Sequence, residues 1–106
     1  MNAKIYIGLT TCNDKKDALH IIKLLLTKGL IACGQVDGPI VSQYIWENKI
    51  QERQEWRVVL KFKIGNEKAL HKALKSEHLY ENPQWAYWQA GSSDEFSQWV
   101  NNPSEN

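Results

Sequence analysis

Long apolar runs are missing from this 106-residue sequence, and none approaches the roughly 18 residues that a membrane span needs. A surplus of one charge is also missing, because 13 Lys and Arg stand against 12 Asp and Glu. Domains that bind nucleic acid normally carry a marked basic excess, so the net charge of +1 argues against that partner. The two cysteines are too few for a disulfide framework.

No apolar leader segment follows Met1, so we expect a cytoplasmic protein with reduced cysteines and no membrane partner. The length suits one domain, and a hydrophobic fraction of 42% excludes wholesale disorder. We therefore predict a single domain over 1–106, with an ordered core over about 4–100 and a flexible tail over 101–106.

Large aromatic rings are abundant. Five Trp, four Tyr and two Phe make up 10% of the chain, and every Trp follows Tyr44. Such rings dominate both cores and subunit interfaces. A domain of this size has little room inside for all of them, so the composition favours an oligomer.

Apolar periodicity, together with cap and turn residues, predicts alternating strands and helices. In chain order we expect a strand over 4–9, a helix over 15–28, strands over 30–36, 40–46 and 52–64, a helix over 66–76, a strand over 84–90 and a short helix from 92. Asp14, Asn66 and Ser92 are the expected helix N-caps, and Gly29 is the expected left-handed residue after the first helix. Turns are expected over 10–14 and at Asp37-Gly38-Pro39, and Asn48 is expected at positive φ in a tight reversal.

This βαββαβ order with a C-terminal helix predicts the α+β class, and short right-handed connections favour a ferredoxin-like sandwich. The hairpin over 40–60 is too long for a sheet whose first strand spans only 4–9, so its tip should project beyond the helices. Tyr44, Trp46 and Trp56 on this hairpin would face water unless another chain covered them. We therefore predict that they lie in a subunit interface.

Metal ligands are few. Copper and zinc prefer Cys thiolate and His nitrogen, and the candidates are Cys12, Cys33 and His78. There is no Cys-x-x-Cys or His-x-x-x-His spacing, and His20 and His71 lie off the apolar stripes of their helices. The competing interpretation is that Cys33 is a small hydrophobe and that no single-chain site exists. Neighbouring chains of an oligomer would then have to bring ligands together.

Several segments, in order along the chain, match a known family. They are Leu9-Thr10-Thr11 with Asp14, Gly29-Leu30-Ile31-Ala32-Cys33, Ser42-x-Tyr44-x-Trp46-Glu47-x-Lys49-Ile50, Glu55, Leu60-Lys61-Phe62-Lys63 and His78-x-Tyr80-Glu81-x-Pro83. The ordered set covers nearly the whole chain and resembles the CutA family of divalent-cation-tolerance proteins. The resemblance implies a ferredoxin-like protomer, similar in fold to PII signalling proteins, in a tight homotrimer whose hairpins pair across subunits.

The resemblance also implies a site. The family name comes from a copper-tolerance phenotype, so copper or another divalent cation is the implied metal. Family members gather polar residues near a cleft between subunits, and the matching residues here are Cys33, Trp46, Glu55, Lys63, His78 and Tyr80. These residues would bind a small anion or metabolite, or they would only complete hydrogen bonds within an interface.

The chain departs from the family pattern at several positions. Asn48 stands where the family usually has Gly, Leu79 where it has Pro, and Cys12-Asn13 near its usual Pro-Asp. After Pro83 the family favours aliphatic residues, whereas this chain has the ring-rich stretch 85–88. These differences favour a divergent member whose ligand differs.

Motifs of common enzymes are absent from the sequence, which has no Gly-x-Ser-x-Gly, Walker loop or Gly-x-Gly-x-x-Gly. A Cys12–His78 pair is the remaining enzyme hypothesis. We predict instead a non-enzymatic, PII-like homotrimer that binds a divalent metal ion or a small ligand at inter-subunit clefts and contributes to metal tolerance. The alternative is a structural or adaptor trimer that binds another protein.

Overall fold

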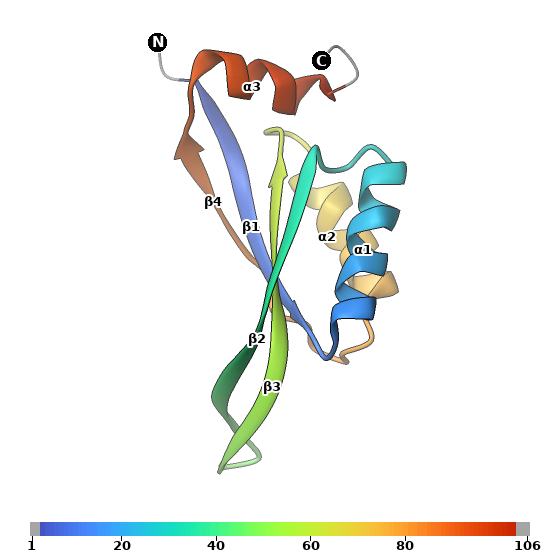
Figure 1. Cartoon of the computed structure of the whole chain (residues 1–106), viewed down its shortest axis with the longest axis vertical. Helices are drawn as coiled ribbons and strands as arrows, with labels where there is room; N and C mark the ends of the chain where they lie inside the picture. The colour runs from blue at the N-terminus through green and yellow to red at the C-terminus, as the bar shows by residue number, and fades with distance from the viewer. Residues whose placement is uncertain (1–2, 104–106) are drawn as a thin grey trace.

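A computed structural model describes residues 3–103 and shows a sheet with two helices packed on one face (Figure 1). In chain order the elements are β1 (Lys4–Cys12), α1 (Lys15–Thr27), β2 (Cys33–Trp46), β3 (Lys49–Phe62), α2 (Glu67–Glu77), β4 (Ala86–Gly91) and α3 (Asp94–Asn101). The strand order is β2-β3-β1-β4, with antiparallel neighbours throughout. The predicted ferredoxin-like βαββαβ arrangement with a C-terminal helix is confirmed.

The core lies between the sheet and the layer formed by α1 and α2. Alternate residues of β3 point toward these helices, as the period of two in a strand requires. The fully buried members are Val58, Leu60 and Phe62 from β3, Ala18 and Leu25 from α1, and Leu70 and Leu74 from α2. Each large side chain of this set stabilises the fold by about 1.5–3 kcal/mol through burial.

Two of the predicted helix ends are confirmed. Asp14 caps α1, because its Oδ1 accepts a hydrogen bond from the backbone N–H of Asp17 at 2.8 Å. Gly29 follows the helix at φ +71°, the left-handed conformation that glycine adopts most easily. Both positions carry the residue type that local backbone geometry demands.

The other two caps differ from the prediction. Ser93, not Ser92, caps α3, since its hydroxyl accepts from the N–H of Phe96 at 3.2 Å. The side chain of Asn66 makes no capping bond to α2 and instead donates to the carbonyl of Leu30 at 3.2 Å. Long-range hydrogen bonding outcompetes the local cap at Asn66.

Strand lengths also differ from the prediction. β1 continues through residues 10–12, where a turn was predicted, because these residues pair with 56–58 of β3. β2 passes through the predicted turn at Asp37-Gly38-Pro39 without reversing. The chain does not turn here because β3 pairs with it on both sides of this segment. One extra residue of β2 instead forms a bulge between Asp37 and Ile40. Asn48 lies at φ +64° in the reversal, as predicted.

The β2–β3 hairpin projects beyond both helices (Figure 1), and it gives the molecule a long axis of 46 Å against 26 and 24 Å. The projection predicted from strand lengths is therefore confirmed. At the other end α3 lies across the end of the sheet (Figure 1), and both Val100 of α3 and Ile5 of β1 are buried. Asn101 belongs to α3, whereas the predicted flexible tail started there; residues 104–106 lie outside the described part of the chain.

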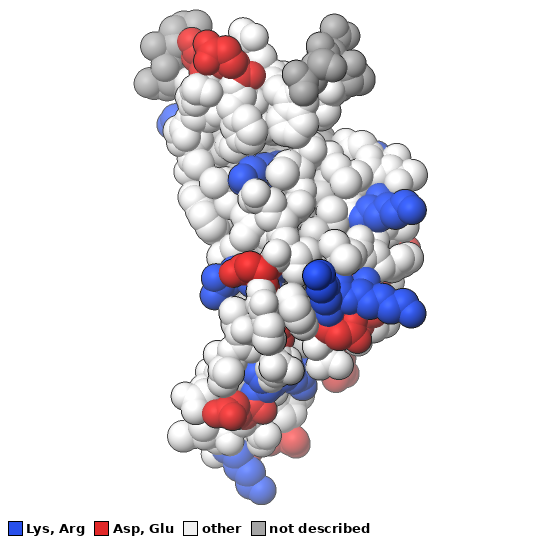
Figure 2. All heavy atoms as spheres, viewed as in Figure 1, with Lys and Arg blue, Asp and Glu red and all other residues white. Residues whose placement is uncertain are grey.

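The sheet face away from α1 and α2 stays partly uncovered. Ile7, Leu9 and Val59 are only half-buried on this face, and Trp88 is 45% exposed. Much of the surface between α3 and the middle of the sheet is uncharged in the view of Figure 2. Among residues 3–103 no helix is long and apolar enough to span a membrane.

Gly8 allows β4 and its aromatic lead-in to pack closely on β1. A Cβ atom at Gly8 would lie 2.6 Å from Cη2 of Trp85, a side chain that also stacks on Phe62. We expect Gly8→Ala to lower the free energy of unfolding by about 1–3 kcal/mol, as overpacking in a filled core does. Urea denaturation measures this. Gly91→Ala in β4 is the control, because a Cβ atom at Gly91 would have no neighbour within 4 Å; equal losses in both variants would contradict the prediction.

Candidate functional site

His78 follows α2 and is buried against β1. Its Nε2 donates to the carbonyl of Thr11 at 2.8 Å, and its Nδ1 accepts from the backbone N–H of Tyr80 at 3.0 Å. A carbonyl only accepts and an N–H only donates, so these partners assign a neutral imidazole that is protonated on Nε2. Burial lowers the pKa of His78 and favours the same neutral form. His78 therefore holds the start of the α2–β4 loop against the sheet.

Glu55 on β3 binds Tyr80, the next residue of the α2–β4 loop that has a side-chain partner on the sheet. Its Oε2 accepts from the Tyr80 hydroxyl at 2.8 Å, and the residue is only 7% exposed. Burial alone would raise the pKa of Glu55, but hydrogen bonds from Ser42, Tyr80 and Thr11 and the charge of Arg53 lower it overall. Burial, followed by the bond to Glu55, raises the pKa of Tyr80 to about 12. At neutral pH the carboxylate is therefore ionised and the phenol protonated.

Arg53 lies beside this pair. Its guanidinium lies 4.9 Å from the ring centroid of Tyr80 and 5.7 Å from that of Tyr44, within cation–π range of both. A hydrogen bond with Tyr80 raises the pKa of Arg53 further, so the group stays charged. Among residues 3–103 the only ion pair within 4.0 Å is Arg57–Asp37, so Arg53 has no carboxylate at that distance.

A cleft of about 870 Å³ opens between the projecting hairpin and the α2–β4 loop. Its hairpin side carries Ser42, Tyr44, Trp46, Gln51, Arg53 and Glu55 from one strand face, together with Gln43 and Ile45, and its other side is residues 79–84. We call it the hairpin cleft. The hairpin forms one wall because side chains two residues apart in a strand share a face. The cleft thus combines a fixed ionised carboxylate, an arginine without a carboxylate partner and aromatic rings.

Four of the six predicted cleft residues meet here. Trp46, Glu55 and Tyr80 line the hairpin cleft, and His78 fixes Tyr80 from behind. Cys33 and Lys63 do not join them within one chain. Cys33 pairs with Lys61 near the far end of β3, and Lys63 follows that end. Six or more residues at about 3.3 Å each put both about 20 Å or more from Glu55 along the strand.

The three predicted metal ligands are not assembled within one chain. Cys12 Sγ lies 3.9 Å from His78 Nε2, but Cys33 lies toward the other end of the sheet. Burial raises the pKa of the Cys12 thiol to about 12, which disfavours the thiolate that metals bind. Residues 3–103 contain no group of three or more His, Cys, Asp or Glu side chains placed to hold a metal ion. A metal site would need ligands from more than one chain.

The predicted interface rings have different surroundings. Trp46 is 50% exposed, whereas Trp56 is half-buried against Gly38 and lies 5.8 Å from the Lys15 ammonium. The most exposed apolar side chains of the hairpin lie on the face opposite Trp46: Val41 is 68% exposed, Ile45 67% and Ile50 77%. Within one chain the uncovered apolar face is thus Val41, Ile45 and Ile50, which sequence reasoning did not single out.

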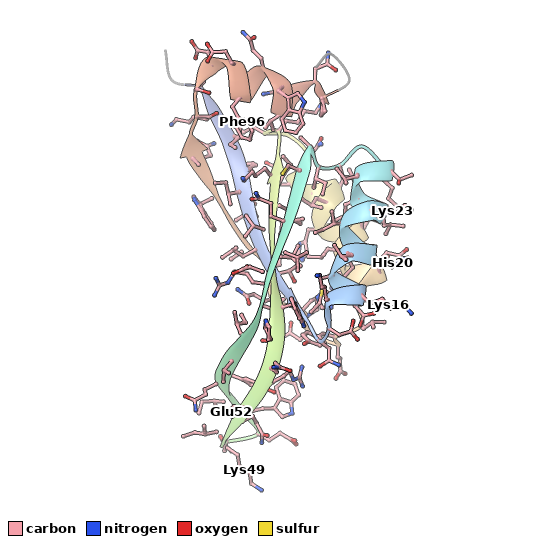
Figure 3. All side chains as sticks on the ribbon, viewed as in Figure 1. Lys16, His20, Lys23, Lys49, Glu52 and Phe96 are labelled. Carbon is pink, nitrogen blue, oxygen red and sulfur yellow. The ribbon has the colours of Figure 1, made fainter. Side chains whose placement is uncertain are left out.

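The remaining histidines lie outside the cleft. His20 points away from the sheet between Lys16 and Lys23 on the outer face of α1 (Figure 3), as the apolar stripe predicts. His71 is exposed too, but its ring stacks on Trp85 with centroids 6.3 Å apart. Arg53 lines the cleft but was not among the residues predicted from the sequence. The available signal was its spacing of two from Glu55, which puts both side chains on one strand face.

The lowered pKa of His78 makes stability depend on pH. In the unfolded chain the imidazole takes up a proton as the pH falls through about 6.5, whereas the folded chain resists it. We therefore expect the free energy of unfolding to fall between pH 7 and pH 5. His78→Gln should flatten this slope, because an amide can donate to Thr11 and accept from Tyr80 without titrating. Urea melts across this range measure the slope; a His20→Gln control that flattens it equally would contradict the assignment.

Comparison with known proteins gives one consistent result. A sequence profile described as CutA1 divalent ion tolerance protein matches residues 6–103. The divalent-cation tolerance protein CutA of Escherichia coli strain K12 / DH10B is 28% identical over 101 residues, which cover 94% of this chain and 90% of that protein.

Solved structures agree with the sequence match. CutA1 from Ehrlichia chaffeensis has a TM-score of 0.87 at 30% identity, covering 94% of both chains. The periplasmic divalent cation tolerance protein CutA from Archaeoglobus fulgidus has a TM-score of 0.85 at 28% identity, covering 92% of this chain and 94% of that one. Together with the match over nearly the whole chain, these likenesses place this protein in the CutA1 divalent ion tolerance family.

Proposed function

We propose that this CutA-family protein is a non-enzymatic homotrimer that binds a divalent metal ion or a small ligand at clefts between subunits and contributes to metal tolerance. The observation that carries the proposal is the hairpin cleft. It holds a buried network of Glu55, Tyr80 and His78 next to apolar side chains that a single chain leaves uncovered. Placing the protein in the cytoplasm remains a prediction from the sequence, and the Archaeoglobus relative is described as periplasmic.

Exposed strand edges and apolar faces support a trimer. β2 and β4 are the two edges of the sheet, so β2 of one chain can pair with β4 of the next and close a ring. The hairpin reaches beyond its own helices and can cover the open sheet face of a neighbour. Such a ring would also close the open side of the hairpin cleft and bring residues of two chains together there.

Ligand chemistry favours a small molecule over a metal ion held by one chain. Glu55 is already engaged by Ser42, Tyr80 and Thr11. Both nitrogens of His78 have partners. A metal ion would therefore need new donors from a neighbouring chain, whereas a small ligand can use groups that already face the cleft.

The burial and the raised pKa of Cys12, the candidate nucleophile, argue against an enzyme. Cys12 is 1% exposed, and burial raises the pKa of its thiol to about 12. Nucleophilic cysteines instead have lowered pKa values and reachable sulfur atoms. The Cys12–His78 contact at 3.9 Å therefore supports packing better than catalysis.

Light scattering and calorimetry test the proposal. We expect a particle of three times the 12.3 kDa chain mass at micromolar concentration. Copper, zinc or a member of a panel of organic acids and nucleotides should bind saturably, and Trp46→Ala should weaken that binding more than Trp99→Ala. A 12.3 kDa particle would contradict the trimer.

An adaptor trimer is the second candidate. The observation that favours it is the exposure of large side chains outside the hairpin: Tyr87 and Trp88 on β4, and Leu79 at 73%. Rings and aliphatic side chains of this kind are typical anchors for protein partners. A trimer that binds nothing in the calorimetric panel but loses a partner on Trp88→Ala would favour this role.

A further inference from the structure

We propose that the hairpin cleft binds a planar aromatic anion, whose charged group meets Arg53 and whose ring packs on Trp46. The proposal rests on the small-ligand form of the proposed function and names the chemical class of that ligand. The class is an aromatic ring joined to a carboxylate or a phosphate.

Arg53 is held in place without being neutralised. The rings of Tyr80 and Tyr44 lie 4.9 and 5.7 Å from its guanidinium carbon. Stacking on rings restrains a guanidinium and leaves its N–H groups available at the edge, where they match the paired oxygens of a carboxylate or phosphate. Arg57 on the same strand contrasts with it, because Arg57 pairs with Asp37 at 3.4 Å.

The acidic residues of the cleft form no direct ion pair with Arg53, although the charge of Glu55 acts on it from beyond 4.0 Å. Glu55 is 7% exposed and accepts hydrogen bonds from its own chain, so it fixes Tyr80. Glu81, the other acid lining the cleft, lies on the opposite wall, and no carboxylate of residues 3–103 comes within 4.0 Å of Arg53. An anionic group of a ligand would supply a direct partner at hydrogen-bond distance.

The aromatic side chains of the cleft favour a ligand whose uncharged part is a flat ring. Trp46 lines the outer end of the cleft with half of its surface exposed, and it shares a hairpin face with Tyr44 and Arg53. Ser42, the cross-strand partner of Arg53, is four residues from Trp46, which is about 13 Å along the strand. A molecule that contacts both the Arg53 guanidinium and the Trp46 ring across this span has the length of a nucleotide. The 870 Å³ volume is within the usual range for such ligands.

Calorimetry of the full-length protein with four probes tests the proposal. Adenosine monophosphate and indole-3-acetate join a ring to a phosphate or a carboxylate, adenosine has the ring alone, and inorganic phosphate has the charge alone. We expect at least one of the first two to bind at least ten-fold more tightly than either single-feature probe. Which one binds identifies the anionic group. Equal affinity for adenosine, or no binding of either ring-containing anion, would overturn the proposal.

Variants locate the binding. Arg53→Gln should weaken binding at least ten-fold, and Arg53→Lys should recover only part of the loss because an ammonium has no paired N–H edge. Arg57→Gln is the matched control from the same strand and should leave affinity unchanged. Unchanged affinity in both Arg53 variants would overturn the assignment.

The same samples separate this inference from the proposed function. Trimeric protein that binds copper or zinc but none of the ring-containing anions would overturn the ligand class and leave the proposed function standing. Arg53-dependent binding of a ring-containing anion to monomeric protein would support the ligand class and contradict the trimer.

Discussion

Replacing Ile45 and Ile50 together by Asp is expected to convert the proposed trimer into folded monomers. The two residues are cross-strand partners near the hairpin tip, 67% and 77% exposed in the single chain. If a neighbouring subunit covers them, each substitution places a carboxylate in an apolar contact, and the change is repeated at every interface of the ring. Truncating a central interface side chain alone typically costs 2 kcal/mol or more, and an unpaired buried charge costs several.

Light scattering over a dilution series measures the loss, with circular dichroism to show that the monomers keep their fold. The hairpin tip carries no core residue, so folding should survive. Leu19→Asp on α1 is the control, because Leu19 is also 50% exposed but lies on a helix outside the hairpin and off the buried stripe of α1. A double variant that stays trimeric would place the subunit contact elsewhere, with the open sheet face around Trp88 as the remaining apolar surface.

Glu55→Ala is expected to lower the free energy of unfolding by about 2–4 kcal/mol, because it removes a buried carboxylate and leaves the half-buried Tyr80 hydroxyl without its acceptor. The 2.8 Å hydrogen bond from the Tyr80 hydroxyl to Glu55 is the bond lost. Urea denaturation at pH 7 measures the effect. The α2–β4 loop should also exchange its backbone amides faster, since Tyr80 links it to β3.

A neighbouring glutamate provides the matched control. Glu52 lies three residues earlier on β3, is exposed and accepts one hydrogen bond, from Gln43 at 3.1 Å. Glu52→Ala should change stability by less than about 0.5 kcal/mol, as most surface substitutions do. Similar losses for the two alanine variants would show that the buried network contributes no more than a surface hydrogen bond.

The ring-rich segment before and within β4 shows how one stretch of sequence takes on two roles. Trp85 stacks on Phe62 and fills the space above Gly8, so it belongs to the packing of the domain. Tyr87 contacts the Tyr6 ring at 5.1 Å on the same side. Trp88 points to the other face of the sheet and is 45% exposed. Strand alternation predicts this division, but only the fold shows which face has a partner.

Most of the architecture was predictable because it follows from local rules. Alternation and helical spacing determined the element order, Asp14 and Gly29 determined the ends of α1, and Asn48 suited the positive φ of the hairpin reversal. Strand lengths alone predicted the projecting hairpin. These features depend on residues within a few positions of each other, whose preferences act whatever the rest of the chain does.

Tertiary pairing decided what local signals could not. Asp37-Gly38-Pro39 has strong turn chemistry, yet β3 lies beside it and holds it in a bulged strand. The sequence predicts Cys12 in a turn and Cys33 in an apolar strand, but the sheet extends through Cys12, which lies buried beside His78, and its register puts Cys33 beside Lys61. The hairpin cleft itself arises because His78 binds a carbonyl 67 positions earlier and Tyr80 a carboxylate 25 positions earlier. Such contacts depend on how distant segments pack, and no pattern along the chain encodes them directly.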